Sequence, residues 1–132
     1  MDYRPLGRTG LVVSRLGFGS LSLTPPHGLA DPSSGIALLE EALDRGVNLI
    51  DTAEIYENYY LLRRALARRR DGVVVATKSY AYTRTDMEHS LVRALRELNR
   101  PYIDIFLLHE QESALTLRGH YEALAYLVEA RD

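Results

Sequence analysis

Four polar residues that could transfer protons each stand where an apolar run ends, or shortly after it. Asp51 closes "VNLID", Lys78 closes "GVVVATK" and His109 closes "YIDIFLLH". Tyr56 follows Asp51 by five residues, which is the distance of a short loop. A lysine ammonium at the end of an apolar run needs a partner, and Asp51 offers the counter-charge.

Together these side chains could form a proton relay that ends on the tyrosine. An ammonium beside a phenol favours the phenolate and lowers a pKa that is about 10 in model peptides. A tyrosine tuned in this way can donate a proton near neutral pH and take it back in the reverse reaction. The neutral imidazole of His109 could orient a carbonyl oxygen by a hydrogen bond.

Three of these residues also have a purely structural explanation, whereas Lys78 is harder to explain without a partner. Asp51 could cap a loop or a helix, Tyr56 could simply pack, and His109 could be a satisfied core histidine. The shared site is the stronger hypothesis for the four together, because Asp51 would explain the burial of Lys78.

The elements that must position these residues alternate between strand and helix patterns. Strands are predicted at 15–20, 47–51, 72–78 and 102–109. Helical spacing of apolar residues predicts helices at 33–46, 58–70, 85–99 and 118–132. Repeats of about 30 residues are typical of βαβ units, which form a parallel sheet covered by helices. The pattern fits an open doubly wound sheet or part of a (β/α)8 barrel, and in both the functional side chains gather at the carboxyl ends of the strands.

Two local signals refine this arrangement. Gly7-Arg8-Thr9-Gly10 separates the strand patterns at 3–6 and 11–14, which predicts a short β-hairpin before the first parallel strand. Thr85 and Glu88 have the spacing of a capping box, which predicts the start of the third helix.

The composition is that of an ordinary globular protein, and residues 1–132 are expected to form a single domain. Apolar residues make up 46% of the chain, charged residues 26%, and the net charge is −2. We therefore expect a cytoplasmic protein with neither nucleic acid nor a membrane among its partners. The chain has no cysteine, and its histidines and acids lack the spacing of metal ligands, so no metal is expected.

Two sets of charged or titratable residues are expected at the surface. The second predicted helix carries a basic cluster of five arginines: Arg63, Arg64, Arg68, Arg69 and Arg70. We interpret this cluster as a solvated outer face, with phosphate or nucleic-acid binding as the alternative. His89 and His120 are also expected to be exposed.

The motifs are similar, in order and in context, to those of a known family. "YRPLGRTGLVVSRLGFGS" resembles the opening hairpin and first barrel strand of the aldo-keto reductases. "GVNLIDTAEIY", "VVVATKS" and "YIDIFLLHEQ" resemble the family's aspartate–tyrosine, lysine and histidine segments. The resemblance implies the amino-terminal half of a (β/α)8 TIM barrel, with about four parallel strands and outer helices. It also implies that Asp51, Tyr56, Lys78 and His109 are the catalytic tetrad.

The same resemblance implies a reaction, a substrate class and a cofactor. In the family, a hydride passes from NADPH to the carbonyl carbon of an aldehyde or ketone while the tyrosine protonates the oxygen. Gly19 and Ser20, in the floor of the site, would bind the cofactor together with Asp51. Glu57 stands where the family usually has glycine after the tyrosine, and we expect its side chain to face solvent.

The number of predicted strands departs from the family. Its barrel has eight strands, four are predicted here, and most residues that hold the cofactor come from the second half. The last helical pattern also runs to Asp132 without a glycine or asparagine cap, which predicts a truncated product or a fragment. We expect weak or no activity of the chain alone, and a homo-oligomer formed through exposed strand edges. The alternative is a non-catalytic half-barrel that associates with itself or with a partner chain.

Overall fold

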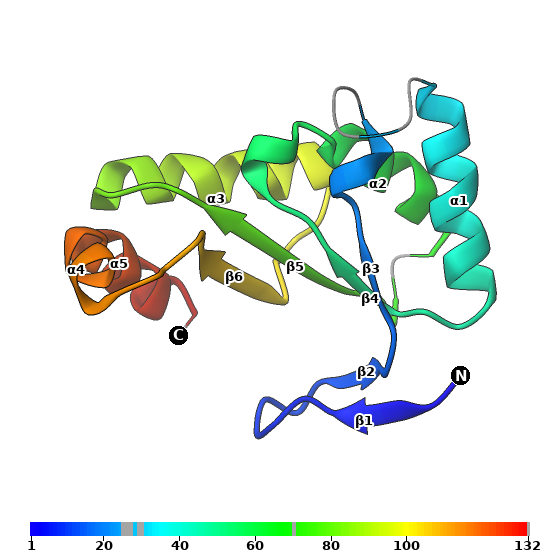
Figure 1. Cartoon of the computed structure of the whole chain (residues 1–132), viewed down its shortest axis with the longest axis horizontal. Coiled ribbons are helices and arrows are strands. Elements are labelled where there is room, and N and C mark those ends of the chain that lie inside the picture. Colours follow the sequence, from blue (N-terminus) through cyan, green and yellow to red (C-terminus); the bar gives the residue numbers. More distant parts are fainter. Residues whose placement is uncertain (25–27, 29–30, 70, 132) are drawn as a thin grey trace.

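A computed structural model of the chain describes residues 1–24, 28, 31–69 and 71–131. It has the predicted α/β architecture, with a short antiparallel hairpin followed by a parallel sheet (Figure 1). The hairpin pairs β1 (Tyr3–Pro5) with β2 (Val12–Ser14). The sheet has the order β3 (Gly17–Gly19), β4 (Leu49–Asp51), β5 (Val74–Ser79) and β6 (Ile105–Leu108), with every neighbouring pair parallel. The order confirms the half-barrel prediction of consecutive strands side by side.

Four of the five described helices form a row in chain order on one side of this sheet, and the short helix that precedes the last one packs against it (Figure 1). The five are α1 (Pro32–Asp44), α2 (Tyr59–Ala65), α3 (Arg84–Leu98), α4 (Ala114–Gly119) and α5 (Tyr121–Arg131). Helix α1 packs on α2, α2 packs on α3, and α3 packs on α5. Three single 3-10 turns complete the described elements: η1 (Leu21–Leu23), η2 (Glu54–Tyr56) and η3 (Leu66–Arg68). Among the described helices, none has the length and apolar character needed to cross a bilayer.

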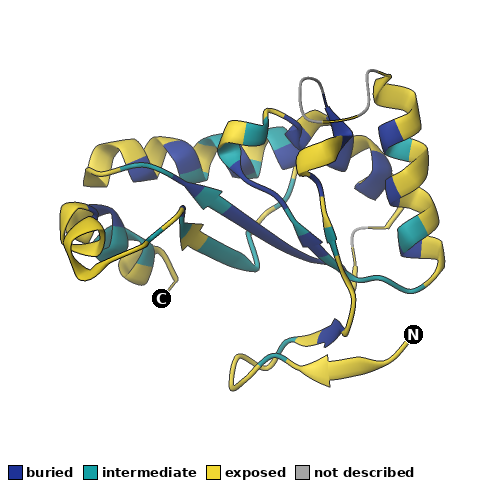
Figure 2. Cartoon of the chain, viewed as in Figure 1, coloured by how far each residue is buried: buried dark blue, intermediate teal, exposed yellow. Residues whose placement is uncertain are grey.

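The hydrophobic core lies between the sheet and the helix row (Figure 2). Leu39, Ile50, Leu61, Leu62 and Val75 are completely buried there. Removing each such side chain from water contributes roughly 1.5–3 kcal/mol, so this layer provides most of the driving force that fixes the strands.

The burial of the strands follows their place in the sheet. β5 is flanked by a strand on each side and is buried along almost its whole length, as its β-branched sequence predicts. β6 comes from a similarly apolar run, "YIDIFLLH", but it is only half-buried, and Leu107 is 43% exposed. The reason is that β6 is the last strand of the described sheet, so nothing pairs with its outer edge.

Helix α2 ends at Ala65, before the predicted end at residue 70, and two further helix boundaries differ from the sequence prediction. Helix α3 begins after Thr83, whose hydroxyl accepts a hydrogen bond from the Asp86 amide at 3.1 Å. The predicted capping box at Thr85 and Glu88 is therefore wrong by about half a turn. The predicted helix at 118–132 is also two helices, because Ser113 forms a capping box that starts α4 and the chain turns at His120 before α5.

Candidate active site

The parallel register brings the carboxyl ends of the strands to one edge of the sheet. Asp51 is the last residue of β4, Lys78 is the next-to-last residue of β5, and His109 directly follows β6. Backbone hydrogen bonds continue past the strands, since the His109 amide donates to the Ser79 carbonyl at 3.0 Å. The strands thus deliver three of the four predicted side chains to the same rim.

Lys78 and Asp51 form the ion pair that the sequence suggests. The Lys78 ammonium donates to Asp51 Oδ2 at 2.7 Å and to the Thr52 carbonyl at 2.7 Å. The Lys78 side chain is 16% exposed and that of Asp51 is 45% exposed. The ammonium is therefore mostly removed from water, and the carboxylate replaces part of its hydration.

Tyr56 lies against both the lysine and the histidine. It ends η2, the 3-10 turn that follows β4. Lys78 Nζ is 5.5 Å from the centroid of the Tyr56 ring, and the ring of His109 meets it edge-on at 6.0 Å and 76°. The four residues selected from the sequence therefore converge on one place.

His109 lies between two aromatic rings, those of Tyr56 and Tyr80. It is 7% exposed, and Tyr80 stacks on it with centroids 4.3 Å apart and planes 19° apart. Burial lowers the pKa of His109, and the charge of Lys78 lowers it further. The neutral form can donate a single hydrogen bond to a carbonyl oxygen, as the sequence hypothesis requires.

Tyr80 is in turn fixed by Glu110, and the sequence analysis selected neither residue. The Tyr80 hydroxyl donates a hydrogen bond to the Glu110 carboxylate, which raises the pKa of Tyr80 to about 12. Glu110 has a φ of 52°, a left-handed conformation that is uncommon for residues other than glycine. Glu110 directly follows His109, so the residue next to the imidazole also holds the ring that stacks on it. The sequence signal that could have identified Tyr80 is its position two residues after Lys78, at the same strand end.

The two residues proposed to bind the cofactor with Asp51 occupy different environments. A Cβ atom built on Gly19 would have no heavy atom within 4 Å, so its backbone is openly accessible. Ser20 is completely buried, and its amide donates to the Asp51 carbonyl at 2.8 Å. Gly19 can thus approach a ligand, whereas the Ser20 side chain belongs to the supporting layer.

Asn58 is the centre of that supporting layer, and the sequence analysis did not identify it. Its side-chain amide donates to the Ser20 carbonyl at 2.8 Å and accepts from the Thr52 hydroxyl at 2.9 Å. Asn58 is completely buried, so these bonds join the ends of β3 and β4 in a dry environment. Its position as the first residue of the helix predicted at 58–70 suggests a cap, yet its side chain does not cap α2.

The other histidines and the basic cluster singled out from the sequence are not part of this site. His89 is exposed as expected, but the expected exposure of His120 is wrong: it is 3% exposed and stacks on Tyr82 at 4.1 Å. Four arginines of the basic cluster, Arg63, Arg64, Arg68 and Arg69, are exposed, and Arg70 lies outside the described residues. Within the described residues, no group of three or more histidines and acids could hold a metal ion.

Comparison with known proteins gives a consistent result. Residues 15–132 match the model of the Aldo/keto reductase family. The rice protein named "Probable voltage-gated potassium channel subunit beta" is 30% identical, over 98% of this chain and 43% of its own length. A candidate aldo-keto reductase from Pseudomonas aeruginosa superposes with a TM-score of 0.83 and 29% identity, over 98% of this chain and 56% of that chain. An aldo-keto reductase from Bacillus halodurans superposes with a TM-score of 0.80 and 27% identity, over 98% and 47%. The chain thus spans about half the length of the proteins it matches.

Proposed function

Because the chain belongs to the aldo-keto reductase family, we propose that its rim residues form the acid–base centre of a carbonyl reductase. The observation that carries this proposal is the convergence of four side chains from three strand ends. Lys78 is paired with Asp51 at 2.7 Å and lies 5.5 Å from the Tyr56 ring, and His109 lies against the same ring.

The roles follow from what each group can do in these positions. The Tyr56 hydroxyl donates its proton to the oxygen of an aldehyde or ketone as the carbonyl carbon is reduced, which yields an alcohol. Lys78 stabilises the phenolate that remains, until a proton from water restores the phenol. His109 orients the carbonyl oxygen by one hydrogen bond.

The residues on this rim fit the reacting end of a nicotinamide cofactor. Gly19 offers an open backbone beside Asp51, whose carboxylate is partly exposed. Both groups can therefore approach the carboxamide and the ribose of a nicotinamide nucleotide. NADPH, when bound, supplies the hydride and is oxidised to NADP⁺. The phosphates of NADPH would need free cations. Lys78 and Arg93 already form ion pairs with carboxylates, so they are poorly suited to bind these phosphates. We therefore propose weak cofactor binding by the 132-residue chain.

We also propose that the chain self-associates through the edges of its sheet. β3 and β6 each have one unpaired side in the described sheet, and edges of this kind are templates for pairing with another chain. The alternative function is a half-barrel that binds a partner without catalysis. The channel-subunit name of the rice relative supports this alternative, because it describes a protein that assembles with another chain.

A cofactor titration combined with a turnover assay distinguishes the two functions. Reduced nicotinamide fluorescence reports binding of NADPH, with NADH as the comparison that lacks the 2′-phosphate. We expect binding of NADPH and slow, carbonyl-dependent oxidation that the Tyr56→Phe variant lacks. An oligomer that neither binds NADPH nor oxidises it would favour the non-catalytic half-barrel.

A further inference from the structure

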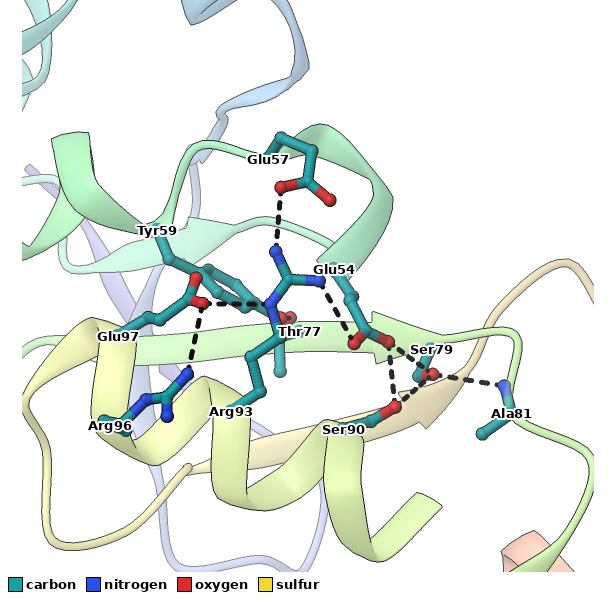
Figure 3. A network of polar contacts seen from close by, with 10 residues as sticks. All are labelled: Glu54, Glu57, Tyr59, Thr77, Ser79, Ala81, Ser90, Arg93, Arg96 and Glu97. Atoms are coloured by element: carbon teal, nitrogen blue, oxygen red, sulfur yellow. Dashed lines mark hydrogen bonds and ion pairs between the residues drawn. The ribbon is translucent and has the colours of Figure 1, made fainter. Parts of the chain in front are cut away.

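Arg93 is an arginine of the outer helix α3 that contacts both ends of the segment carrying Tyr56 (Figure 3). Its Nη2 lies 2.7 Å from Glu57 Oε2, and its Nη1 lies 3.6 Å from Glu54 Oε1. Glu54 begins η2 and Glu57 directly follows Tyr56. One planar guanidinium therefore spans the short turn from end to end.

The guanidinium is itself fixed on its helix. Its Nε donates to Glu97 at 3.0 Å, one turn further along α3, and the Arg93 side chain is 32% exposed. With Glu54 and Glu57, this places three carboxylates around one cation. The arrangement holds Arg93 in one orientation rather than leaving it a mobile surface side chain.

Glu54 also connects the turn to the strand that carries Lys78. Its Oε2 accepts hydrogen bonds from the Ser79 hydroxyl at 2.7 Å and the Ser90 hydroxyl at 2.9 Å (Figure 3). Ser79 is the residue after Lys78 in β5, and Ser90 belongs to α3. The start of the Tyr56 turn is thus tied to the same strand that delivers the ammonium.

Glu57 occupies a backbone conformation that L residues rarely adopt. Its φ is 51°, in the left-handed region, which glycine enters freely. Such a conformation persists in a residue with a side chain only where the surroundings determine it. The Glu57 carboxylate meets Arg93, so this position carries a tether that glycine could not provide.

We propose that Arg93 is a positioning residue for Tyr56, which it fixes against Lys78 and His109 by holding Glu54 and Glu57. The proposal rests on Tyr56 being the proton donor of the proposed reductase. Without the guanidinium, both carboxylates lose their common partner and the turn gains freedom. In an assembly with turnover, a displacement of about 1 Å at a reacting group lowers kcat by about 100-fold.

The direct test is NMR of the whole chain with labelled tyrosine and histidine rings, which does not require turnover. The Tyr56 ring signals are identified by their loss in Tyr56→Phe. Arg93→Gln should shift the signals of Tyr56 and His109. The matched control is Arg96→Gln on the same helix, because Arg96 is 77% exposed and lies 3.9 Å from Glu97. It should leave the Tyr56 signals at their wild-type positions.

Three further variants separate the tether from a general loss of structure. Glu57→Gln removes the ion pair between Arg93 and Glu57 and leaves those with Glu54 and Glu97. It should shift the Tyr56 signals in the same direction as Arg93→Gln, but by a smaller amount. The double variant Arg93→Gln with Glu57→Gln should give the same shift as Arg93→Gln alone. The ion pair between Arg93 and Glu57 is already lost in Arg93→Gln, so removing the Glu57 charge breaks no further contact with Arg93. Arg93→Lys keeps the charge on a single ammonium and should give an intermediate shift.

The proposal is overturned if the Tyr56 signals do not move in Arg93→Gln, or if Arg96→Gln moves them equally. Should Arg93→Gln fail to fold, Glu57→Gln and Arg93→Lys decide the matter by the same criterion. The outcome for the reductase is separate. If Tyr56→Phe retained full turnover while Arg93→Gln still moved the ring, the proposed function would fail and the positioning role would stand.

Discussion

The ammonium of Lys78 and the carboxylate of Asp51 lie 2.7 Å apart and join the ends of two neighbouring strands, β5 and β4. The lysine side chain is the more buried partner, at 16% exposure against 45%. The pair is therefore asymmetric. Losing the carboxylate would leave a mostly desolvated ammonium with the Thr52 carbonyl, whereas losing the ammonium would leave a carboxylate that water can reach.

This asymmetry predicts a difference between two variants. Asp51→Asn should lower the free energy of unfolding by about 2 kcal/mol, because it leaves a poorly compensated charge. Lys78→Met should cost less, since Asp51 is half-exposed. Urea unfolding of both variants and of the double variant measures the coupling. Equal losses in the two single variants would contradict the prediction.

Tyr56→Phe should abolish carbonyl reduction in any assembly that shows it. The substitution removes only the hydroxyl, so the ring keeps its contacts with Lys78 and His109. The assay is carbonyl-dependent oxidation of NADPH, with Tyr60→Phe as the control because Tyr60 is 42% exposed on α2. Wild-type kcat in Tyr56→Phe would mean that another group is the acid.

His109 should make stability depend on pH near neutrality. Burial and the nearby Lys78 lower its pKa in the folded chain, while Asp51 and Glu110 oppose that shift. The unfolded chain takes up this proton near pH 6.5, and the folded chain takes it up only at lower pH. The contribution to stability is therefore complete above that value and is lost as the pH falls through the folded pKa.

The measurement for His109 is urea unfolding at about pH 7.5 and about pH 5.5, on either side of the ordinary histidine pKa. His109→Gln should lose less stability over this interval than the wild type, because the remaining titrating groups are common to both chains. An identical loss in the two chains would show that His109 does not contribute.

Asn58→Ala should be strongly destabilising although Asn58 is polar and touches no proposed reactant. It would leave the Ser20 carbonyl and the Thr52 hydroxyl without their partner in a fully buried place. Each unsatisfied group costs about 1–3 kcal/mol, so we expect a loss of about 3 kcal/mol in the free energy of unfolding. A loss of about 0.5 kcal/mol, typical of an exposed position, would refute this role.

The 132-residue chain should sediment as a dimer or a larger oligomer at micromolar concentration. The unpaired edges of β3 and β6 and the exposed side chain of Leu107 favour association. Burying the apolar side chains on these edges contributes roughly 1.5–3 kcal/mol each, against a total stability of about 5–15 kcal/mol for a domain. A compact monomer that unfolds cooperatively would contradict the prediction.

The sheet and three catalytic candidates were predictable because parallel topology translates sequence order directly into spatial order. A polar residue that ends a buried strand must lie at the rim, which places Asp51, Lys78 and His109. The residues that support the site, such as Asn58 and Arg93, were harder to predict from the sequence. Whether Asn58 or Arg93 faces the site depends on how a helix is rotated against a loop, and periodicity alone does not determine that rotation.

The incorrect predictions also have identifiable causes. Thr83 and Thr85 are both followed by an acid three residues later, so the sequence offered two caps and the backbone selected the first. His120 was expected to be exposed because it follows glycine. Its burial comes from stacking on Tyr82, which belongs to an earlier unit and is distant in sequence.

The strand order has a consequence for how the protein is made on the ribosome. Each strand of the parallel sheet pairs only with its neighbours in sequence, so when β4, β5 or β6 emerges the preceding strand is already available as a partner. The pair between Asp51 and Lys78 belongs to β4 and β5 alone, so it can form before β6 and His109 have emerged. The strand order therefore allows the site to assemble in chain order, with the ion pair formed before the imidazole is added.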